Sequence, residues 1–373
     1  MAELQQYLKN GDEIIYRCCA AHLTADGTYL NETGKTKQQV EDVLKQSIFE
    51  RKKATRVPEQ LAKDIMTYLM NNRPGIAGVQ EFTDEDITKL LPMFLDEIDS
   101  AAQTRLDGEL GSLANPLPTQ INKNGMHVIV IGAGPSGVAA GVKMREAGIS
   151  FTIYERGTNC GGTWYHNTYP EAGCDVPSHF YSFSFAPNKK WSRHFSKSKE
   201  IATYVQDTAE SWDLLPFIEF QTEVIGCRFN EKTKMWHVKT KDYNGNEKEN
   251  IGNVVISACG QLSRPNIPPI KGKDDFEGPA SHTAEWGKFS KISFKDRKVA
   301  LVGTGASAMQ LLRNIAKEAK ELNVFQQIPS WFQRSPTYHK AVEDDLKWRI
   351  GNVPMYVKFV KFDSPKSKKS YAL

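Results

Sequence analysis

The fold of this chain rests on one short motif, Gly132-Ala133-Gly134-Pro135-Ser136-Gly137. It follows an apolar, β-branched run from His127 to Ile131, which predicts a buried parallel strand. After it, Val138 to Ala147 have the pattern of a helix, with Gly148 as the stop signal. A strand, a glycine loop and a helix in this order predict a dinucleotide-binding βαβ unit.

Each glycine of the motif has its own expected task. Gly132 allows a tight turn, Gly134 allows the backbone to approach a pyrophosphate, and Gly137 allows the helix to pack closely on the strand. The next predicted strand, Phe151 to Tyr154, leads into Glu155, which is placed to accept a hydrogen bond from a ribose hydroxyl. The amides at the helix start are expected to bind the phosphates.

A second motif of the same kind is Gly303-Thr304-Gly305-Ala306-Ser307-Ala308. Its flanks predict a strand over Lys298 to Val302, a helix over Ala308 to Glu321, and a further strand over Asn323 to Phe325. Ala308 takes the place of the third glycine, which the fingerprint tolerates. Two such units in one chain predict two dinucleotides, a flavin and a nicotinamide.

The second unit lacks the acid that follows the first. Gln326 and Gln327 stand after its last predicted strand. A carboxylate recognises the free 2′-hydroxyl of NAD, whereas a phosphorylated ribose needs a nearby arginine or lysine. The missing acid therefore favours NADP, and Arg334 and Lys340 are the nearest cations downstream.

The composition limits the classes of partner. Across 373 residues, 48 basic and 44 acidic side chains leave a net charge of +4, which does not indicate a nucleic-acid surface. The six cysteines have no Cys-x-x-Cys spacing, and the histidines show no pairing at metal-ligand spacing, so we expect no metal. Without a signal peptide or an apolar run of membrane-spanning length, we expect a cytoplasmic protein that does not bind membranes.

Three regions are expected along the chain: an N-terminal extension over 1–120, the first part of one dinucleotide domain over 121–270, and a second over 271–373. In the extension, Glu59 to Asn71 and Asp84 to Ile98 have helical spacing of apolar residues. It resembles no catalytic constellation. We therefore interpret it as a mostly helical accessory segment and a candidate homodimer surface.

A third motif, Phe276-x-Gly278-x-x-x-His282-x-x-x-Trp286, lies between the two glycine loops. Together with Gly161-Gly162-Thr163-Trp164-Tyr165, Cys174-Asp175-Val176 and the aromatic run from Tyr181 to Phe185, it resembles the Baeyer–Villiger monooxygenases, the class B flavoprotein monooxygenases. The long extension and the segment from Trp331 to Tyr356 resemble the 4-hydroxyacetophenone monooxygenase-like branch. The resemblance covers residues 125–362, with weaker support over the extension.

The resemblance implies an α/β fold with two Rossmann-like domains, one for FAD and one for NADPH. The implied reaction inserts one oxygen atom of O2 into a ketone and yields an ester or a lactone. Asp175 resembles the acid that orients an active-site arginine beside the flavin, and His282 the histidine that organises the domain junction. The residues implied to bind FAD are Gly132, Gly134, Gly137, Glu155, Thr163, Trp164, Asp175 and Tyr181; those for NADP are Gly303, Gly305 and Ser307; the signature positions are Phe276, Gly278, His282 and Trp286.

Other interpretations of these residues stay open. By residue type alone, Asp175 is a turn-capping acid before Pro177, His282 is a buried structural histidine, and the aromatic residues around Trp164 and Tyr181 are core. As alternatives to ketone oxygenation, the chain is a non-catalytic dinucleotide-binding remnant, or a flavin monooxygenase that acts on sulfur or nitrogen. The Phe276–Trp286 signature favours the ketone reaction over the latter.

The sequence departs from the family in several places. Gly287 stands where the family usually has proline or aspartate, and Gln327 where many relatives have an arginine for the 2′-phosphate. The family's active-site arginine and the segment that completes its FAD domain have no counterpart before Leu373. We therefore expect an N-terminal portion or a truncated product with incomplete domains. By itself it is expected to bind FAD weakly or not at all, to aggregate, and not to oxygenate ketones. The substrate, the regiochemistry and the oligomeric state are not encoded in recognisable motifs.

Overall fold

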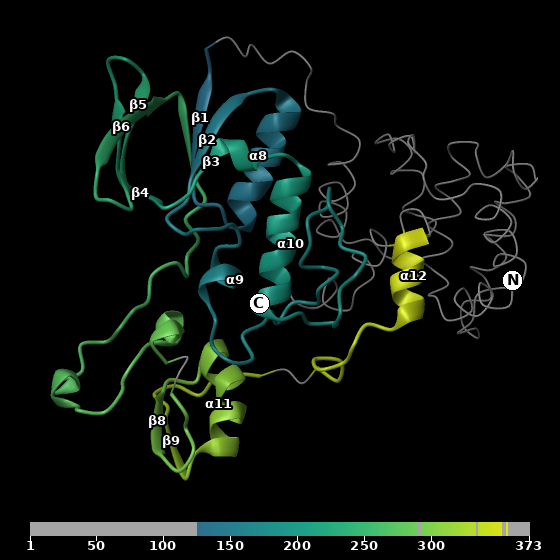
Figure 1. Ribbon diagram of the computed structural model, residues 1–373, viewed down its shortest axis with the longest axis vertical. Helices are drawn as coiled ribbons and strands as arrows, with labels where there is room; N and C mark the ends of the chain where they lie inside the picture. Colours follow the sequence, from purple (N-terminus) through teal and green to yellow (C-terminus); the bar gives the residue numbers. More distant parts are fainter. Residues whose placement is uncertain (1–124, 290–291, 333–334, 353–355, 357–373) are drawn as a thin grey trace, which may run out of the picture. The chain divides into compact units, whose positions relative to one another are not determined.

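The computed structural model describes residues 125–289, 292–332, 335–352 and 356 (Figure 1). The predicted helical extension over 1–120 and its candidate dimer surface lie outside the described residues. The chain divides into two compact units. Among the described residues, one unit contains those up to Pro177 and from Phe195 to His339, and the other contains Ser178–His194 and those from Lys340 onward.

The first predicted βαβ unit is present in the larger described unit. Its elements are β1 (His127–Ile131), α8 (Pro135–Ala147) and β2 (Ser150–Tyr154), and β1 pairs with β2 in parallel. The strand forms because Val128, Ile129 and Val130 are buried and can pack on both faces of a sheet. The helix begins at Pro135, since proline fits the first helical position, and ends where Gly148 adopts a φ of 62°.

Two further parallel strands extend this sheet in the order β3-β2-β1-β7, with β3 at Ile218–Glu219 and β7 at Val254–Ser257. Between β2 and β3 the chain forms α9 (Thr163–His166), α10 (Ser198–Ser211) and the short 3-10 turn η2 (Leu215–Phe217). In Figure 1, α10 lies beside α8.

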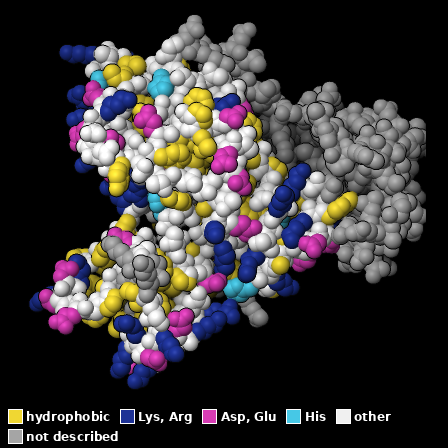
Figure 2. Space-filling view, viewed as in Figure 1, with side chains coloured by type: hydrophobic (Ala, Val, Ile, Leu, Met, Phe, Trp, Pro, Cys, Tyr) yellow, Lys and Arg dark blue, Asp and Glu magenta, His cyan; other side chains and the backbone are white. Residues whose placement is uncertain are grey.

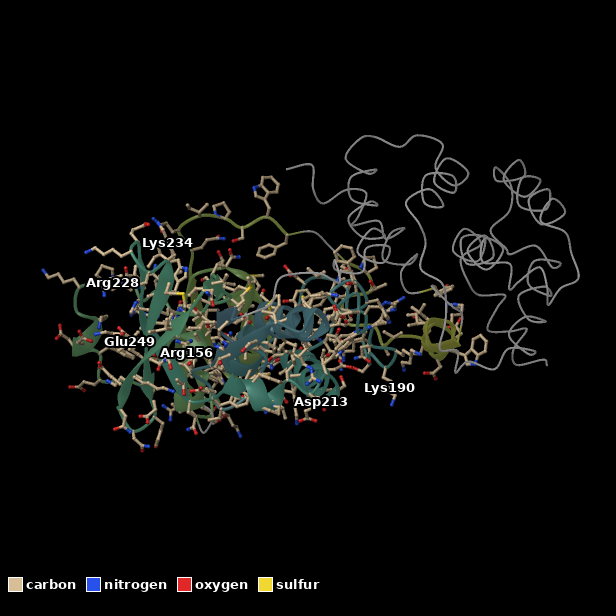
Figure 3. All side chains as sticks on the ribbon, turned by 90° about the horizontal axis from the view of Figure 1, so that it is seen from above. Arg156, Lys190, Asp213, Arg228, Lys234 and Glu249 are labelled. Atoms are coloured by element: carbon tan, nitrogen blue, oxygen red, sulfur yellow. The ribbon has the colours of Figure 1, made fainter. Side chains whose placement is uncertain are left out.

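In the sequence, an antiparallel meander separates β3 from β7. It consists of β4 (Thr222–Asn230), β5 (Met235–Asp242) and β6 (Glu247–Gly252). Val238 of β5 is buried against Ile129 and Tyr154, which joins the meander to the parallel sheet. Charged side chains cover its exposed side, including Arg228, Lys234 and Glu249 (Figure 3).

The second βαβ unit consists of β8 (Lys298–Val302), α11 (Ala306–Glu318) and β9 (Glu321–Phe325), with β8 and β9 in parallel. The expected helix over Ala308 to Glu321 is wrong at both ends. The helix begins at Ala306, directly after the N-cap Gly305. It ends early because the N–H of Lys320 donates to the carbonyl of Arg297 at 2.9 Å, which starts β9 instead of another helical turn.

In the smaller described unit, the segment Ser178–His194 pairs with the chain before α12 (Asp344–Asn352) through an isolated bridge between Arg193 and Ala341. The fully buried Trp191 donates from Nε1 to the Ser182 hydroxyl at 3.1 Å.

Acidic and basic side chains are interspersed over the molecular face shown in Figure 2. Among the residues that the structure describes, no helix combines the length and the apolar character that a bilayer span requires.

Candidate dinucleotide-binding sites

Two positions of the first glycine loop require glycine, because a side chain at either position would clash with the backbone. Gly132 has a φ of 100°, and a Cβ there would lie 2.7 Å from the carbonyl oxygen of Ala258. A Cβ on Gly137 would lie 1.8 Å from the carbonyl oxygen of Gly132, so the helix can pack this closely only with glycine. A Cβ on Gly134 would meet Gly162 at an ordinary 3.5 Å. Packing therefore requires Gly132 and Gly137, whereas nothing within the described chain demands glycine at position 134.

A second glycine pair covers this loop. The N–H of Gly161 donates to the carbonyl of Ala133 at 3.0 Å, and a Cβ on Gly162 would lie 2.9 Å from the Cα of Gly134. The following residues, Thr163 and Trp164, begin α9 directly after this contact. In the sequence, Gly161 and Gly162 were only part of a family motif, and their role against the first loop depends on contacts that spacing does not reveal.

Glu155 follows β2 and is 5% exposed. Its two carboxylate oxygens accept hydrogen bonds from the N–H groups of Ala133 and Gly157, each at 2.7 Å, and His166 Nε2 lies 3.7 Å away. Burial by itself would raise the pKa of Glu155, but His166 and the two backbone donors outweigh burial and lower the pKa. The side chain is therefore an anion attached to the glycine loop, and its Oε2, which accepts from the N–H of Ala133, has a second lone pair for a further donor.

The second loop repeats the first in its backbone hydrogen bonding. The N–H of Gly303 donates to the carbonyl of Phe325 at 2.9 Å, as that of Gly132 does to Tyr154 at 2.8 Å. Gln326 therefore stands where the first unit has Glu155. Its amide donates to the Thr304 hydroxyl at 3.1 Å, so a neutral group replaces a carboxylate at the end of the strand.

The role of the two cations named downstream of this second loop stays a prediction. Arg334 lies outside the described residues, and Lys340 belongs to the smaller unit.

The two βαβ units meet through α11. Tyr169 and Ala172, which follow α9, are buried with Leu311 and Ile315 of α11, and Trp286 packs against this group. Above this apolar cluster, the Tyr169 hydroxyl donates to Gln310 Oε1 at 2.8 Å. Burial raises the pKa of Tyr169, and a hydrogen bond with Ser307 lowers it in part, so the predicted NADP-loop residue Ser307 lies at this junction.

Gln310 was missed by sequence reasoning. A glutamine on an amphipathic helix is typical of a solvated face, and no motif marks it. Its Nε2 donates to the carbonyl of Gly173 at 2.8 Å and to the Tyr338 hydroxyl at 3.3 Å.

The exposed Asp175 lies close to Tyr338 in the same unit. Burial raises the pKa of Tyr338, and the negative charge of Asp175 raises it further. Tyr181, also predicted to line the flavin, belongs to the smaller unit, so its place at the site stays a prediction.

The signature residues have separate surroundings. Phe276 directly follows the short 3-10 segment η3 (Lys273–Asp275), His282 directly precedes η4 (Thr283–Phe289), and Trp286 lies within η4. Phe276 is 63% exposed and its ring lies over Gly278, while His282 Nδ1 accepts a hydrogen bond from the N–H of Ala284 at 3.1 Å. Trp286 contacts Phe294, with ring centroids 6.0 Å apart. Of these four residues, only Trp286 contacts the apolar cluster that joins the two βαβ units.

Comparison with known proteins gives one family match. The family model described as "Pyridine nucleotide-disulphide oxidoreductase" matches residues 129–363. A Baeyer-Villiger monooxygenase of Streptomyces coelicolor is 39% identical over 207 residues, which are 55% of this chain and 38% of that protein. A Baeyer-Villiger monooxygenase of Pseudomonas aeruginosa is 33% identical over 242 residues, 65% of this chain and 44% of that protein.

Solved structures give the same picture. A steroid monooxygenase bound to NADP matches with a TM-score of 0.54 and 32% identity, over 60% of this chain and 42% of that one. OTEMO in complex with FAD and NADP matches with a TM-score of 0.53 and 32% identity, over 60% of this chain and 43% of that one. The chain thus spans less than half the length of each of these relatives.

Proposed function

Since the chain belongs to the pyridine nucleotide-disulphide oxidoreductase family, we propose that it binds FAD at the loop Gly132–Gly137 and NADPH at the loop Gly303–Ser307, as part of a Baeyer–Villiger monooxygenase. The overall reaction consumes a ketone, O2, NADPH and a proton. It yields an ester or a lactone, NADP⁺ and water, because one oxygen atom enters the substrate and the other is reduced. The named Baeyer-Villiger relatives support this reaction type.

The observation that carries the proposal is the difference between two otherwise equivalent loops. Both begin with a glycine whose N–H bonds to the end of the next strand. At that strand end the first loop has the buried anion Glu155, which suits the ribose hydroxyls of FAD, and the second has the neutral Gln326. A neutral amide does not repel a 2′-phosphate, so this pair of ends fits one FAD and one NADPH.

The residues present fit both groups. Packing does not require glycine at position 134, so the missing side chain leaves room for a pyrophosphate beside the first turn of α8. The N–H groups of this turn have no partner within the helix and can bind a phosphate. Within the part of the chain that the structure describes, no atom lies within 4 Å of a Cβ added at Gly303 or Gly305, which leaves the second loop open to a ligand. When bound, FAD supplies hydride acceptance and oxygen activation, which no side chain provides.

In the proposed reaction, the residues of this chain would orient the bound cofactor and shield it from water. Glu155 would accept from the ribose, and the Gly161–Trp164 segment would cover the pyrophosphate side of the first loop. Asp175, exposed and near Tyr338, would orient a cation toward the reacting oxygen. An anionic oxygen needs such a cation in a site from which water is excluded.

The test combines binding with product analysis. The purified protein is titrated with FAD and with NADP⁺, then incubated with NADPH and 4-hydroxyacetophenone. Ester formed in step with NADPH consumption supports the proposal. Oxygenation of a thioether or an amine in place of the ketone would assign the sulfur or nitrogen reaction. Binding without any product would leave a dinucleotide-binding protein, and absence of FAD and NADP⁺ binding would overturn the assignment.

A further inference from the structure

The side-chain amide of Gln310 joins the second dinucleotide loop to the first half of the site. Gln310 lies on α11, one turn after Ser307, and α11 starts at the glycine loop that we assign to NADPH. Its Oε1 accepts from the Tyr169 hydroxyl at 2.8 Å, and its Nε2 donates to the carbonyl of Gly173 at 2.8 Å. One amide thus contacts two points of the segment 169–175 from the same helix.

The segment that receives these contacts is itself attached to the first loop. The N–H of Cys174 donates to Ser196 at 3.0 Å, and the N–H of Ser198 donates to Ala172 at 2.8 Å. The Ser198 hydroxyl oxygen lies 2.7 and 2.8 Å from the carbonyl oxygens of Trp164 and Asn167, which share its single proton. Because Trp164 follows the glycine pair that covers the first loop, Gln310 connects the two loops through hydrogen bonds and the short chain segments between them.

The apolar cluster beneath this amide does not by itself define the position of α11. Tyr169, Ala172, Leu311 and Ile315 bring the helix and the segment together, but apolar contacts are non-directional. Hydrogen bonds at 2.8 Å are directional and specify one arrangement. The amide is also matched to its partners, since a hydroxyl faces its acceptor and a carbonyl faces its donor.

We propose that Gln310 is a positioning residue that holds the Gly303–Ser307 loop in a defined place relative to the segment Tyr169–Asp175, and thereby aligns the nicotinamide with the flavin. The alignment part rests on the proposed function. The mechanical part, a link between α11 and residues 169–175, does not depend on any bound cofactor.

The mechanical part is tested on the cofactor-free protein by amide hydrogen exchange. Gln310→Met keeps the length of the side chain but removes the donor and the acceptor. Lys317→Met, at an exposed position two turns along α11, is the matched control. We expect exchange to rise at least tenfold at residues 172–174 and around Gly305–Met309 in Gln310→Met and to be unchanged in the control. Equal exchange in the two variants would overturn the link.

A pH series separates a specific amide contact from general loss of packing. In Gln310→Glu, the ionised carboxylate cannot donate to Gly173, whereas the protonated acid offers one donor for the Gly173 carbonyl and one acceptor for the Tyr169 hydroxyl. We expect the exchange defect of this variant, relative to wild type, to disappear as the pH falls from 7.5 to 5, because facing a carbonyl raises the pKa of the new acid. A defect that stays constant over this range would show that only packing was lost.

The alignment part is tested in protein that binds both cofactors. Gln310→Met is expected to reduce the rate of flavin reduction at saturating NADPH at least tenfold, because small misplacement of reacting groups is costly. The dissociation constants for FAD and NADP⁺ should stay within about threefold of wild type, since neither phosphate loop is altered. Unchanged reduction would overturn the alignment role. If wild type binds neither cofactor, the proposed function fails, and hydrogen exchange still decides the link.

Discussion

At the scale of single residues, the three glycines of the first loop serve different physical needs. Gly137 is required by the carbonyl of Gly132, which a Cβ would approach to 1.8 Å, and Gly132 is required by its φ of 100° and by Ala258. Neither a steric clash nor a positive φ requires glycine at position 134. This difference separates residues that build the loop from the one that leaves space for a ligand, and it can be measured.

Substituting alanine at positions 137 and 134 should give opposite results. Gly137→Ala is expected to reduce the free energy of unfolding by about 3 kcal/mol, because the helix must move away from the loop. Gly134→Ala should cost less than about 1 kcal/mol, the difference between glycine and alanine at an N-cap, but should abolish FAD binding. Chemical denaturation and FAD titration check both. A Gly134→Ala protein with normal FAD affinity would contradict our assignment of the space.

The end of β9 is expected to control the choice between NADPH and NADH. Gln326→Glu places a carboxylate where the first loop has Glu155, and it should lower the preference for NADP⁺ over NAD⁺ by about tenfold or more, because the acid repels a 2′-phosphate and accepts from a free hydroxyl. Titrations with NADP⁺ and NAD⁺ measure this ratio.

The neighbouring Gln327 gives a test of opposite sign. Gln327→Arg should increase the preference for NADP⁺ by an amount on the order of 1 kcal/mol or more, since it adds a charge-assisted hydrogen bond to the phosphate. An unchanged ratio in both variants would show that the phosphate is recognised elsewhere.

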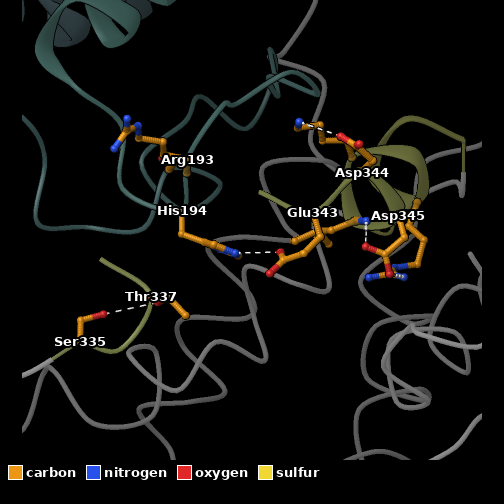
Figure 4. Close-up of polar contacts among 11 residues, drawn as sticks. Arg193, His194, Ser335, Thr337, Glu343, Asp344 and Asp345 are labelled. Carbon is orange, nitrogen blue, oxygen red and sulfur yellow. Dashed lines mark hydrogen bonds and ion pairs between the residues drawn. The ribbon is translucent and has the colours of Figure 1, made fainter. Parts of the chain in front are cut away.

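At the scale of elements, one hydrogen bond between side chains attaches Glu343, which directly precedes α12, to the segment Ser178–His194. His194 Nε2 lies 2.9 Å from Glu343 Oε2 (Figure 4). Burial would raise the pKa of Glu343, but its own backbone N–H and the bond from His194 outweigh burial and lower the pKa from its usual 4.5. The backbone adds one contact next to this pair, from the N–H of His194 to the carbonyl of Lys340 at 3.1 Å.

The attachment of α12 should therefore depend on pH. Since the folded protein lowers the pKa of Glu343, its contribution is complete above pH 4.5 and is lost as the pH falls through the lowered value. We expect amide exchange at Lys347, corrected for intrinsic rates, to rise between pH 6 and pH 3.5. Glu343→Gln should remove this dependence, whereas Asp344→Asn, which affects an ion pair within α12, should retain it. A Glu343→Gln protein with wild-type pH dependence would contradict the attribution.

At the scale of the whole larger unit, the cluster of Tyr169, Ala172, Leu311 and Ile315 packs α11 of the second βαβ unit against the segment that follows α9. The second unit is small, with two strands and one helix, and β8 and β9 expose Val302, Val324 and Phe325. Its stability must therefore draw on the buried face of α11 that packs against the first unit.

Weakening this face should loosen the second unit selectively. Leu311→Ala leaves a cavity in the cluster and is expected to cost about 3 kcal/mol. Amide exchange should rise over β8, α11 and β9 while β1 and β2 stay protected. Val302→Ala removes a side chain that is 64% exposed and should change neither region. Uniform loss of protection over both units after Leu311→Ala would contradict this division.

Local chemistry was enough to determine both βαβ units from the sequence. Glycine motifs, β-branched runs and the stop at Gly148 act over a few residues, and the predicted strand His127–Ile131 is confirmed without change. The same locality explains why the sequence does not show which of Gln326 and Gln327 occupies the position equivalent to Glu155. Only the bond from Gly303 to Phe325 shows which of them matches Glu155.

Only the tertiary structure decided the features that depend on residues far apart in the chain. Helix α11 ends at Glu318 because the carbonyl of Arg297 accepts the N–H of Lys320, a competing acceptor that helical spacing does not include. The cover of Gly161–Gly162 over the first loop and the contacts of Gln310 with Tyr169 and Gly173 likewise join distant segments. A hydrogen bond between distant groups forms only after folding has brought them together, so no pattern of neighbouring residues records it.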